Sequence, residues 1–151
     1  MCSCFFIGHR DAPESALPEL AEAVERHITD YRVTDFVVGH YGNFDAMAAR
    51  AVLRAKQRHP QVALTLLLPY PPFGRAVPVP EGFDGTLYPP GMEGTPKRLA
   101  IVRANRWMLG RCRFLIAWVS HPSGGSRQVL EAARRRERRG LLCVTNLGGP
   151  Y

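Results

Sequence analysis

Three short, glycine-containing stretches of this chain each follow an apolar run and precede a helical pattern. They are Gly8-His9-Arg10, Gly39 to Asp45, and Ser123-Gly124-Gly125-Ser126. Where a strand passes into a helix, the unpaired backbone N–H groups of the first helical turn and the helix dipole attract anions. The three stretches together therefore predict one anion-binding pocket.

The third stretch is the strongest candidate for holding a phosphate. The consecutive glycines Gly124 and Gly125 let backbone N–H groups point towards a ligand, and Ser123 and Ser126 add hydroxyl donors. The alternative is a plain turn followed by a helix N-cap.

The first stretch follows its apolar run without a gap. Gly8 permits a sharp exit from a strand, and Arg10 has the planar guanidinium that pairs in two-pronged fashion with phosphate or carboxylate. The alternative is that His9 and Arg10 only hold neighbouring loops in place.

The second stretch contains Gly39, Gly42 and Asp45. It lacks both the G-x-G-x-x-G spacing of a dinucleotide site and the G-K-[S/T] of a P-loop. Its glycines still allow close backbone approach to a ligand. Asp45 either accepts hydrogen bonds from sugar hydroxyls or balances the helix dipole.

Further along, Arg103 and Asn105 are ligand-binding candidates on one helical pattern. Arg103 shares a helix face with Arg106, and the apolar neighbours of Asn105 favour an inward position. The alternative is a pair of exposed arginines on an amphipathic helix.

No cluster for covalent or metal chemistry is evident. The histidines show no H-x-x-x-H spacing, and His27 and His59, late in their helical patterns, are predicted to be surface residues. The four cysteines form no C-x-x-C pair and are predicted to be small buried side chains. We predict no metal site and no cofactor.

The apolar runs and helical patterns alternate along the chain. The runs predict strands at residues 4–7, 36–38, 62–68, 113–119 and 141–145, and the helical patterns lie near residues 13–28, 43–58, 95–109 and 126–139. Such alternation predicts an α/β fold with a mainly parallel sheet of about five strands and helices on both faces. Ligands of such sheets bind at the carboxyl ends of the strands, where all three glycine stretches lie.

One long segment has no period of its own. Residues 69–95 contain seven prolines and five glycines and are predicted to be an insertion loop without helix or strand. After it, Thr95 is predicted as a helix N-cap and Pro96 as the first helical residue.

Length and composition limit the remaining possibilities. A chain of 151 residues with 46% hydrophobic and 22% charged residues predicts one globular domain over residues 1–151. No apolar run approaches the roughly 20 residues of a membrane span, and we expect a cytoplasmic protein. The net charge of +7 owes much to residues 134–139, either a solvated helix end or a nucleic-acid contact.

Four motifs in order resemble the SLOG superfamily, in particular its small bacterial members. They are Phe6 to Arg10, Val38 to Asp45, Arg103 to Met108, and Ser123 to Ser126. The resemblance covers nearly the whole chain and implies a Rossmann-like three-layer sandwich that holds a nucleotide or nucleotide-derived ligand.

The superfamily also includes the Lonely Guy phosphoribohydrolases and the DNA-processing protein A family. Lonely Guy enzymes carry a catalytic glutamate close behind P-G-G-x-G-T. Here the corresponding segment runs from Pro122 to Glu131, so the glutamate is displaced. The catalytic residue, if any, is therefore unknown, with Asp45 and Glu131 as candidates.

We accordingly expect a protein that binds a nucleotide-like small molecule. One version of this hypothesis is that the protein is a sensor of that ligand. The alternatives are a nucleotide-processing hydrolase and a single-stranded nucleic-acid-binding protein. We also expect a homo-oligomer without membrane contact.

Overall fold

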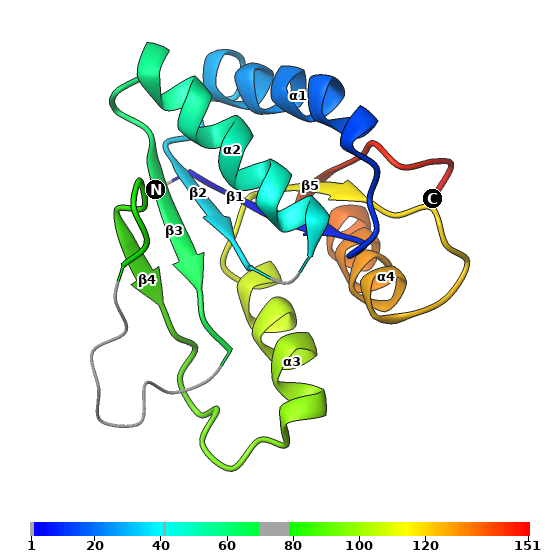
Figure 1. Cartoon of the computed structure of the whole chain (residues 1–151). Helices are drawn as coiled ribbons and strands as arrows, with labels where there is room; N and C mark the ends of the chain where they lie inside the picture. The colour runs from blue at the N-terminus through cyan, green and yellow to red at the C-terminus, as the bar shows by residue number, and fades with distance from the viewer. Residues whose placement is uncertain (1, 41, 70–78) are drawn as a thin grey trace.

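The computed structural model describes residues 2–40, 42–69 and 79–151, and within them it has six strands and four α-helices (Figure 1). The elements are β1 (Ser3–Gly8), α1 (Leu17–Thr29), β2 (Asp35–Val38), α2 (Asn43–Arg58), β3 (Ala63–Leu67), β4 (Gly85–Leu87), α3 (Lys97–Leu109), β5 (Phe114–Trp118), α4 (Gly125–Arg138) and β6 (Cys143–Asn146). The strands form one parallel sheet in the order β4-β3-β2-β1-β5-β6. The predicted α/β class and parallel sheet are confirmed.

The sheet separates two apolar layers. Helices α1 and α2 cover one face, and α3 and α4 cover the other (Figure 1). Successive residues of β1 alternate between them: Cys4 and Phe6 pack with α1 and α2, while Phe5 and Ile7 pack with α3 and α4. Burial on both faces explains why the strands are continuous apolar runs. None of the described helices is long and apolar enough to cross a bilayer.

The sixth strand, β4, lies inside the segment predicted to be without helix or strand. It has three residues at the edge of the sheet, pairs with β3 alone among the described strands, and is too short to show a period. The carboxylate of Asp84 fixes its start: it accepts hydrogen bonds from the backbone N–H of Leu64 at 2.8 Å and from Lys56 Nζ at 2.6 Å. Residues 70–78 of the predicted loop, like Tyr41 of the second glycine stretch, lie outside the described residues.

The predicted start of α3 is displaced by one residue. Pro96 is the N-cap and Lys97 the first helical residue. The Thr95 hydroxyl does not cap this helix and instead accepts a hydrogen bond from Arg103 Nη1 at 3.0 Å.

His27 is buried, contrary to the surface position predicted for it. Its side chain is 1% exposed and its Nδ1–H donates to the backbone carbonyl of Ala23 at 2.7 Å. The ring meets Phe114 edge-on, with 5.5 Å between centroids. Burial lowers the pKa of His27. Its spacing of three from Val24 and seven from Leu20 had placed it on the apolar stripe of α1.

The cysteine prediction is right for two of the four residues. Cys4 and Cys112 are buried, whereas Cys2 is partly exposed and Cys143 is exposed. Burial raises the pKa of the Cys112 thiol to about 12. Cys4 and Cys112 therefore act as small apolar side chains in the two layers of the core.

Gly8 ends β1 beneath an aromatic ring. A Cβ atom at this position would lie 2.2 Å from the Phe44 ring. Phe44, in the first turn of α2, is 1% exposed and packs against Phe6, with 6.4 Å between ring centroids. The absence of a side chain at Gly8 thus allows α2 to begin directly over the end of β1.

We predict that Gly8→Ala lowers the free energy of unfolding by about 1–3 kcal/mol, because the added methyl group overlaps the Phe44 ring. Urea denaturation measures this effect. Gly125→Ala is the matched control, since a Cβ there meets no atom within 4 Å. Equal stability of the two variants would contradict the prediction.

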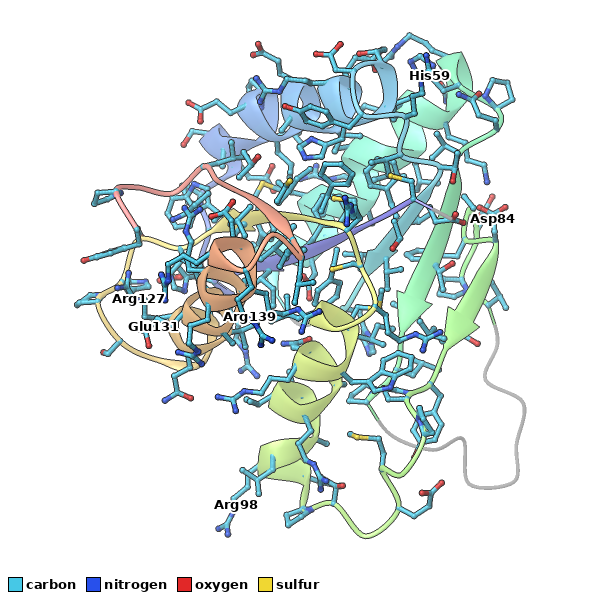
Figure 2. The ribbon with its side chains drawn as sticks, turned by 180° about the vertical axis from the view of Figure 1, so that it is seen from behind. His59, Asp84, Arg98, Arg127, Glu131 and Arg139 are labelled. Atoms are coloured by element: carbon cyan, nitrogen blue, oxygen red, sulfur yellow. The ribbon has the colours of Figure 1, made fainter. Side chains whose placement is uncertain are left out.

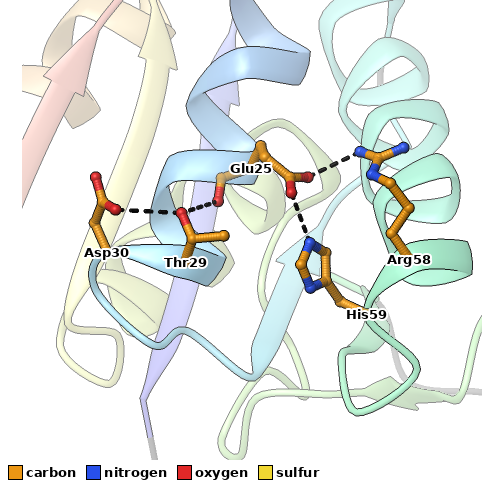
Figure 3. A network of polar contacts seen from close by, with 5 residues as sticks. All are labelled: Glu25, Thr29, Asp30, Arg58 and His59. Atoms are coloured by element: carbon orange, nitrogen blue, oxygen red, sulfur yellow. Dashed lines mark hydrogen bonds and ion pairs between the residues drawn. The ribbon is translucent and has the colours of Figure 1, made fainter.

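A polar network joins the outer sides of α1 and α2 (Figure 3). One carboxylate oxygen of Glu25 accepts from Arg58 Nη2 at 2.8 Å, and the other contacts His59 Nε2 at 2.6 Å. The hydrogen bond from Arg58, followed by that from His59, lowers the pKa of Glu25. About a third of the Glu25 side chain is exposed (35%), so solvent weakens the interaction.

We predict that Glu25→Gln lowers the free energy of unfolding by no more than about 1 kcal/mol at pH 7. Because the pKa of Glu25 is lower in the folded state, its contribution is present above the unfolded pKa and disappears as the pH falls through the folded value. Urea denaturation at pH 7 and pH 3 tests this. Glu22→Gln, an exposed change on the same helix, is the control; a difference between the variants that persists at pH 3 would contradict the assignment.

Candidate functional site

The order of the strands places a cavity at the carboxyl end of β1. The chain adds β2, β3 and β4 on one side of β1 and then returns to add β5 and β6 on the other. The loops after β1 and β5 therefore turn towards opposite faces of the sheet. Open α/β sheets bind ligands in the crevice between two such loops. A cavity of about 400 Å³ lies here, within the usual size range of small-molecule sites.

The structure brings most of the predicted ligand-binding residues to this cavity. Those that line it are Gly8, His9, Arg10, Gly39, Asp45, Asn105, Ser123, Gly124, Gly125 and Ser126. They come from the ends of β1, β2 and β5 and from α2, α3 and α4, so the three glycine stretches meet as the sequence predicted. Gly42, Arg103 and Glu131 do not line it.

The N-terminus of α4 opens into the cavity without a cap. Gly124, the N-cap residue, has φ +106°, a conformation that favours glycine. None of the described side chains caps this end, and the first turn contains no acidic residue. A Cβ added to Gly124 or Gly125 would meet no atom within 4 Å. The positive end of the α4 dipole thus faces open space in the cavity.

The N-terminus of α2 is arranged differently. The backbone N–H of Asn43 donates to the carbonyl of Arg10 at 2.9 Å, and Asp45 places a carboxylate in the first turn. Gly42 has φ +121°, and a Cβ there would lie 2.5 Å from the Arg10 Cα. Gly42 therefore allows the loop after β1 to approach α2, which is a structural role outside the cavity.

Two side-chain hydrogen bonds join the loops on either side of the cavity. Ser126 Oγ donates to the Gly8 carbonyl at 3.2 Å. His9 Nε2 accepts from the backbone N–H groups of Ser120 and His121, at 3.0 and 3.3 Å. The His9 contacts match the alternative in which this residue holds a neighbouring loop in place.

The surroundings of His9 favour its neutral form. The residue is 9% exposed, and its ring centroid lies 4.0 Å from that of His121. Burial lowers the pKa of His9, the nearby His121 lowers it further, and Asp11 acts in the opposite direction. A neutral imidazole has the lone pair that both backbone donors require.

Arg103 and Glu131 have other partners. Arg103 is exposed and donates to Thr95. Glu131 Oε1 accepts from Arg127 Nε at 3.0 Å, and the two side chains lie together beside α4 (Figure 2). The Arg127 guanidinium also lies 3.7 Å from the centroid of the Tyr151 ring. Arg127 and Glu131 line a separate hollow, so Glu131 is not a carboxylate of the main cavity.

The apolar wall of the cavity is formed by residues that were not predicted as site residues. Leu67 and Pro69 at the end of β3 contribute to it, together with Ile101 and Val102 of α3. The apolar pair in α3 lies one turn before Asn105, and that spacing was the available signal. Among the described residues, no group of three or more His, Cys, Asp or Glu side chains could hold a metal ion.

No protein-family model matches the sequence, and no curated protein matches it either. Solved structures do. DNA processing protein A from Streptococcus pneumoniae has a TM-score of 0.72 at 17% identity, over 99% of this chain and 51% of that protein. The same protein from Helicobacter pylori, described for its single-stranded DNA binding mode, has a TM-score of 0.61 at 16% identity, over 95% of this chain and 64% of that one.

The Moco carrier protein of Chlamydomonas reinhardtii also matches, with a TM-score of 0.56 at 12% identity, over 97% of this chain and 76% of that one. The chain therefore shares a Rossmann-like α/β fold with these proteins. At these identities the likeness is one of fold. The chain spans about half of the first DNA processing protein A and under two thirds of the second.

Proposed function

We propose that the cavity binds a nucleotide or nucleotide-derived ligand, with a phosphate at the N-terminus of α4. The observation that carries the proposal is the uncapped start of α4, where Gly124 and Gly125 border a cavity of about 400 Å³. Backbone N–H groups and a helix dipole that meet open space are well suited to an oxyanion. Ser123 also lines the cavity and would add a hydroxyl donor.

The other walls fit the rest of a nucleotide. Asp45 at the start of α2 would accept hydrogen bonds from sugar hydroxyls and would repel a second phosphate at that end. The apolar residues Ile101 and Val102 offer a surface for a base. Arg10 is exposed at the mouth and forms no ion pair within the described residues, so its guanidinium is available to a phosphate.

Proteins of the same fold are consistent with a ligand site. The Helicobacter pylori DNA processing protein A is described as binding single-stranded DNA, and the Chlamydomonas protein is named a carrier of Moco. These ligands differ, so the neighbours support binding as a use of the fold and leave the ligand to the residues of this chain.

We predict that Gly125→Asp abolishes nucleotide binding without lowering the stability of the ligand-free protein. The added side chain enters open space, and a carboxylate is favourable at a helix N-terminus but repels a bound phosphate. Thermal shift with mono-, di- and cyclic nucleotides measures both effects, since a ligand that binds only the folded state raises the melting temperature. Gly125→Ala, which adds a side chain without charge, is the matched control. The absence of a shift for the unmodified protein with every nucleotide would contradict the proposed function.

The hydrolase alternative depends on Asp45, because Glu131 lies in another hollow. Release of free base from a nucleoside monophosphate, lost in Asp45→Asn and kept in Glu131→Gln, would favour this alternative over simple binding.

A second candidate function is suggested by the distribution of charge. Helix α3 has four basic residues and no acidic one, and α4 has five basic and two acidic residues, so the two helices carry a formal charge of +7, equal to that of the whole chain. Figure 2 shows Arg98 of α3 extended away from the sheet. Arg135 and Arg138 border a hollow of about 320 Å³ and form no ion pair within the described part of the chain. Such a surface fits the phosphate backbone of a nucleic acid.

We predict that Arg135→Ala with Arg138→Ala weakens the binding of a single-stranded oligonucleotide about tenfold at low salt and reduces the salt dependence. Fluorescence anisotropy over a series of salt concentrations measures both. Arg26→Ala with Arg54→Ala removes the same charge from exposed positions on α1 and α2 and is the control. Equal losses in the two double variants would show that only net charge matters.

A further inference from the structure

His9 connects β1 to the loop that leads into α4. Its Nε2 accepts hydrogen bonds from the backbone N–H groups of Ser120 and His121, at 3.0 and 3.3 Å. Both partners are donors, so Nε2 must present a lone pair and the proton of the neutral ring resides on Nδ1. The position of these two backbone groups is thereby linked to one tautomer of one side chain.

The same loop is held from its other side. Asn146, at the end of β6, accepts from the Val119 N–H at 2.9 Å and donates to the Val119 carbonyl at 3.0 Å. Three consecutive backbone N–H groups, from residue 119 to residue 121, therefore donate to side chains that lie far away in the sequence. Only three residues separate His121 from Gly125, the first residue of α4, so these bonds hold the loop that leads directly into the helix. Ser126 Oγ holds the helix start itself to the Gly8 carbonyl.

Protonation of His9 is incompatible with this arrangement. A second ring proton on Nε2 would face two N–H donors and break both hydrogen bonds. Two titratable groups act on the ring: the His121 imidazole opposes a positive charge on His9, and the Asp11 carboxylate favours one. Asp11 Oδ1 lies 3.8 Å from His121 Nε2. Arg10 is the next residue in the chain.

We propose that neutral His9 is the positioning residue of the anion site, and that the site weakens when His9 takes up a proton. The proposal rests on the proposed function for its ligand but concerns how the start of α4 is held. The pKa of His9 in the folded protein is lower than its ordinary value of about 6.5, so between these two values the unfolded chain binds the proton more readily than the folded one. The stability contributed by neutral His9 is therefore complete above about pH 6.5 and decreases as the pH falls from there to the folded pKa. The anion affinity of the folded protein decreases as the pH falls through the folded pKa.

The tautomer can be observed without any ligand. We expect nitrogen-detected NMR of the ligand-free protein to show His9 with its proton on Nδ1 at pH 7.5 and resistant to charging as the pH is lowered. A proton on Nε2 at pH 7.5 would overturn the proposal, whatever the protein binds.

Two substitutions separate positioning from simple filling of space. His9→Gln can present an amide oxygen near the position of Nε2, whereas His9→Leu fills the site but accepts no hydrogen bond. We expect His9→Leu to bind sulfate about tenfold more weakly and His9→Gln to remain within about threefold of the unmodified protein, as for the loss of buried hydrogen bonds. Faster amide exchange at Ser120 and His121 is expected in His9→Leu alone.

Sulfate is used because it remains a dianion between pH 5 and 8. Its own titration therefore does not affect the measured dependence of affinity on pH. The measurements are made in the His121→Asn background as well, since a protonated His121 at the mouth would attract anions. We expect sulfate affinity to fall towards pH 5 in both backgrounds. Equal sulfate affinities of His9→Leu and His9→Gln would overturn the positioning role. Failure of the unmodified protein to bind sulfate or any nucleotide would instead overturn the proposed function, and the NMR result would then decide on His9.

Discussion

The carboxyl end of β1 fixes the elements that surround the cavity. Above Gly8 the Phe44 ring occupies the volume that any side chain would need, and this packing sets the start of α2. The Gly8 carbonyl accepts from Ser126 and so fixes the start of α4. One residue later, His9 holds the loop after β5. Two helices and a loop from three parts of the chain are thus positioned from two adjacent residues at the centre of the sheet.

This arrangement gives the two helix N-termini different electrostatic properties. At α2 an N–H group is already bonded to the Arg10 carbonyl, and Asp45 adds negative charge. Neither helix start has a side-chain cap from the described residues, but the first turn of α4 contains no acidic residue. One cavity therefore has an anion-attracting end and an anion-repelling end, which orients a ligand that has a phosphate at one end and hydroxyl groups elsewhere.

The sequence was sufficient for features that depend on local pattern. Buried strands are continuous apolar runs, and their ends place the glycine stretches at one edge of a parallel sheet. It was insufficient where tertiary contacts decide. The three-residue strand β4 depends on Asp84 reaching Leu64, and the role of Gly42 depends on the approach of Arg10. Helical spacing did indicate the burial of His27, but its position late in the helical pattern favoured the surface.

The basic residues of α4 and the cavity at its N-terminus interact only weakly through electrostatics, although they share a helix. Residues 134–138 begin nine positions after Gly125, which corresponds to roughly 14–20 Å along the helix axis. This distance exceeds the Debye length of about 8 Å at physiological salt, so these arginines contribute little to anion binding in the cavity. Cations in the last turn are also stabilised by the negative end of the helix dipole, with or without a partner. Arginine substitutions therefore test the nucleic-acid surface alone, and changes at Gly125 test the cavity alone.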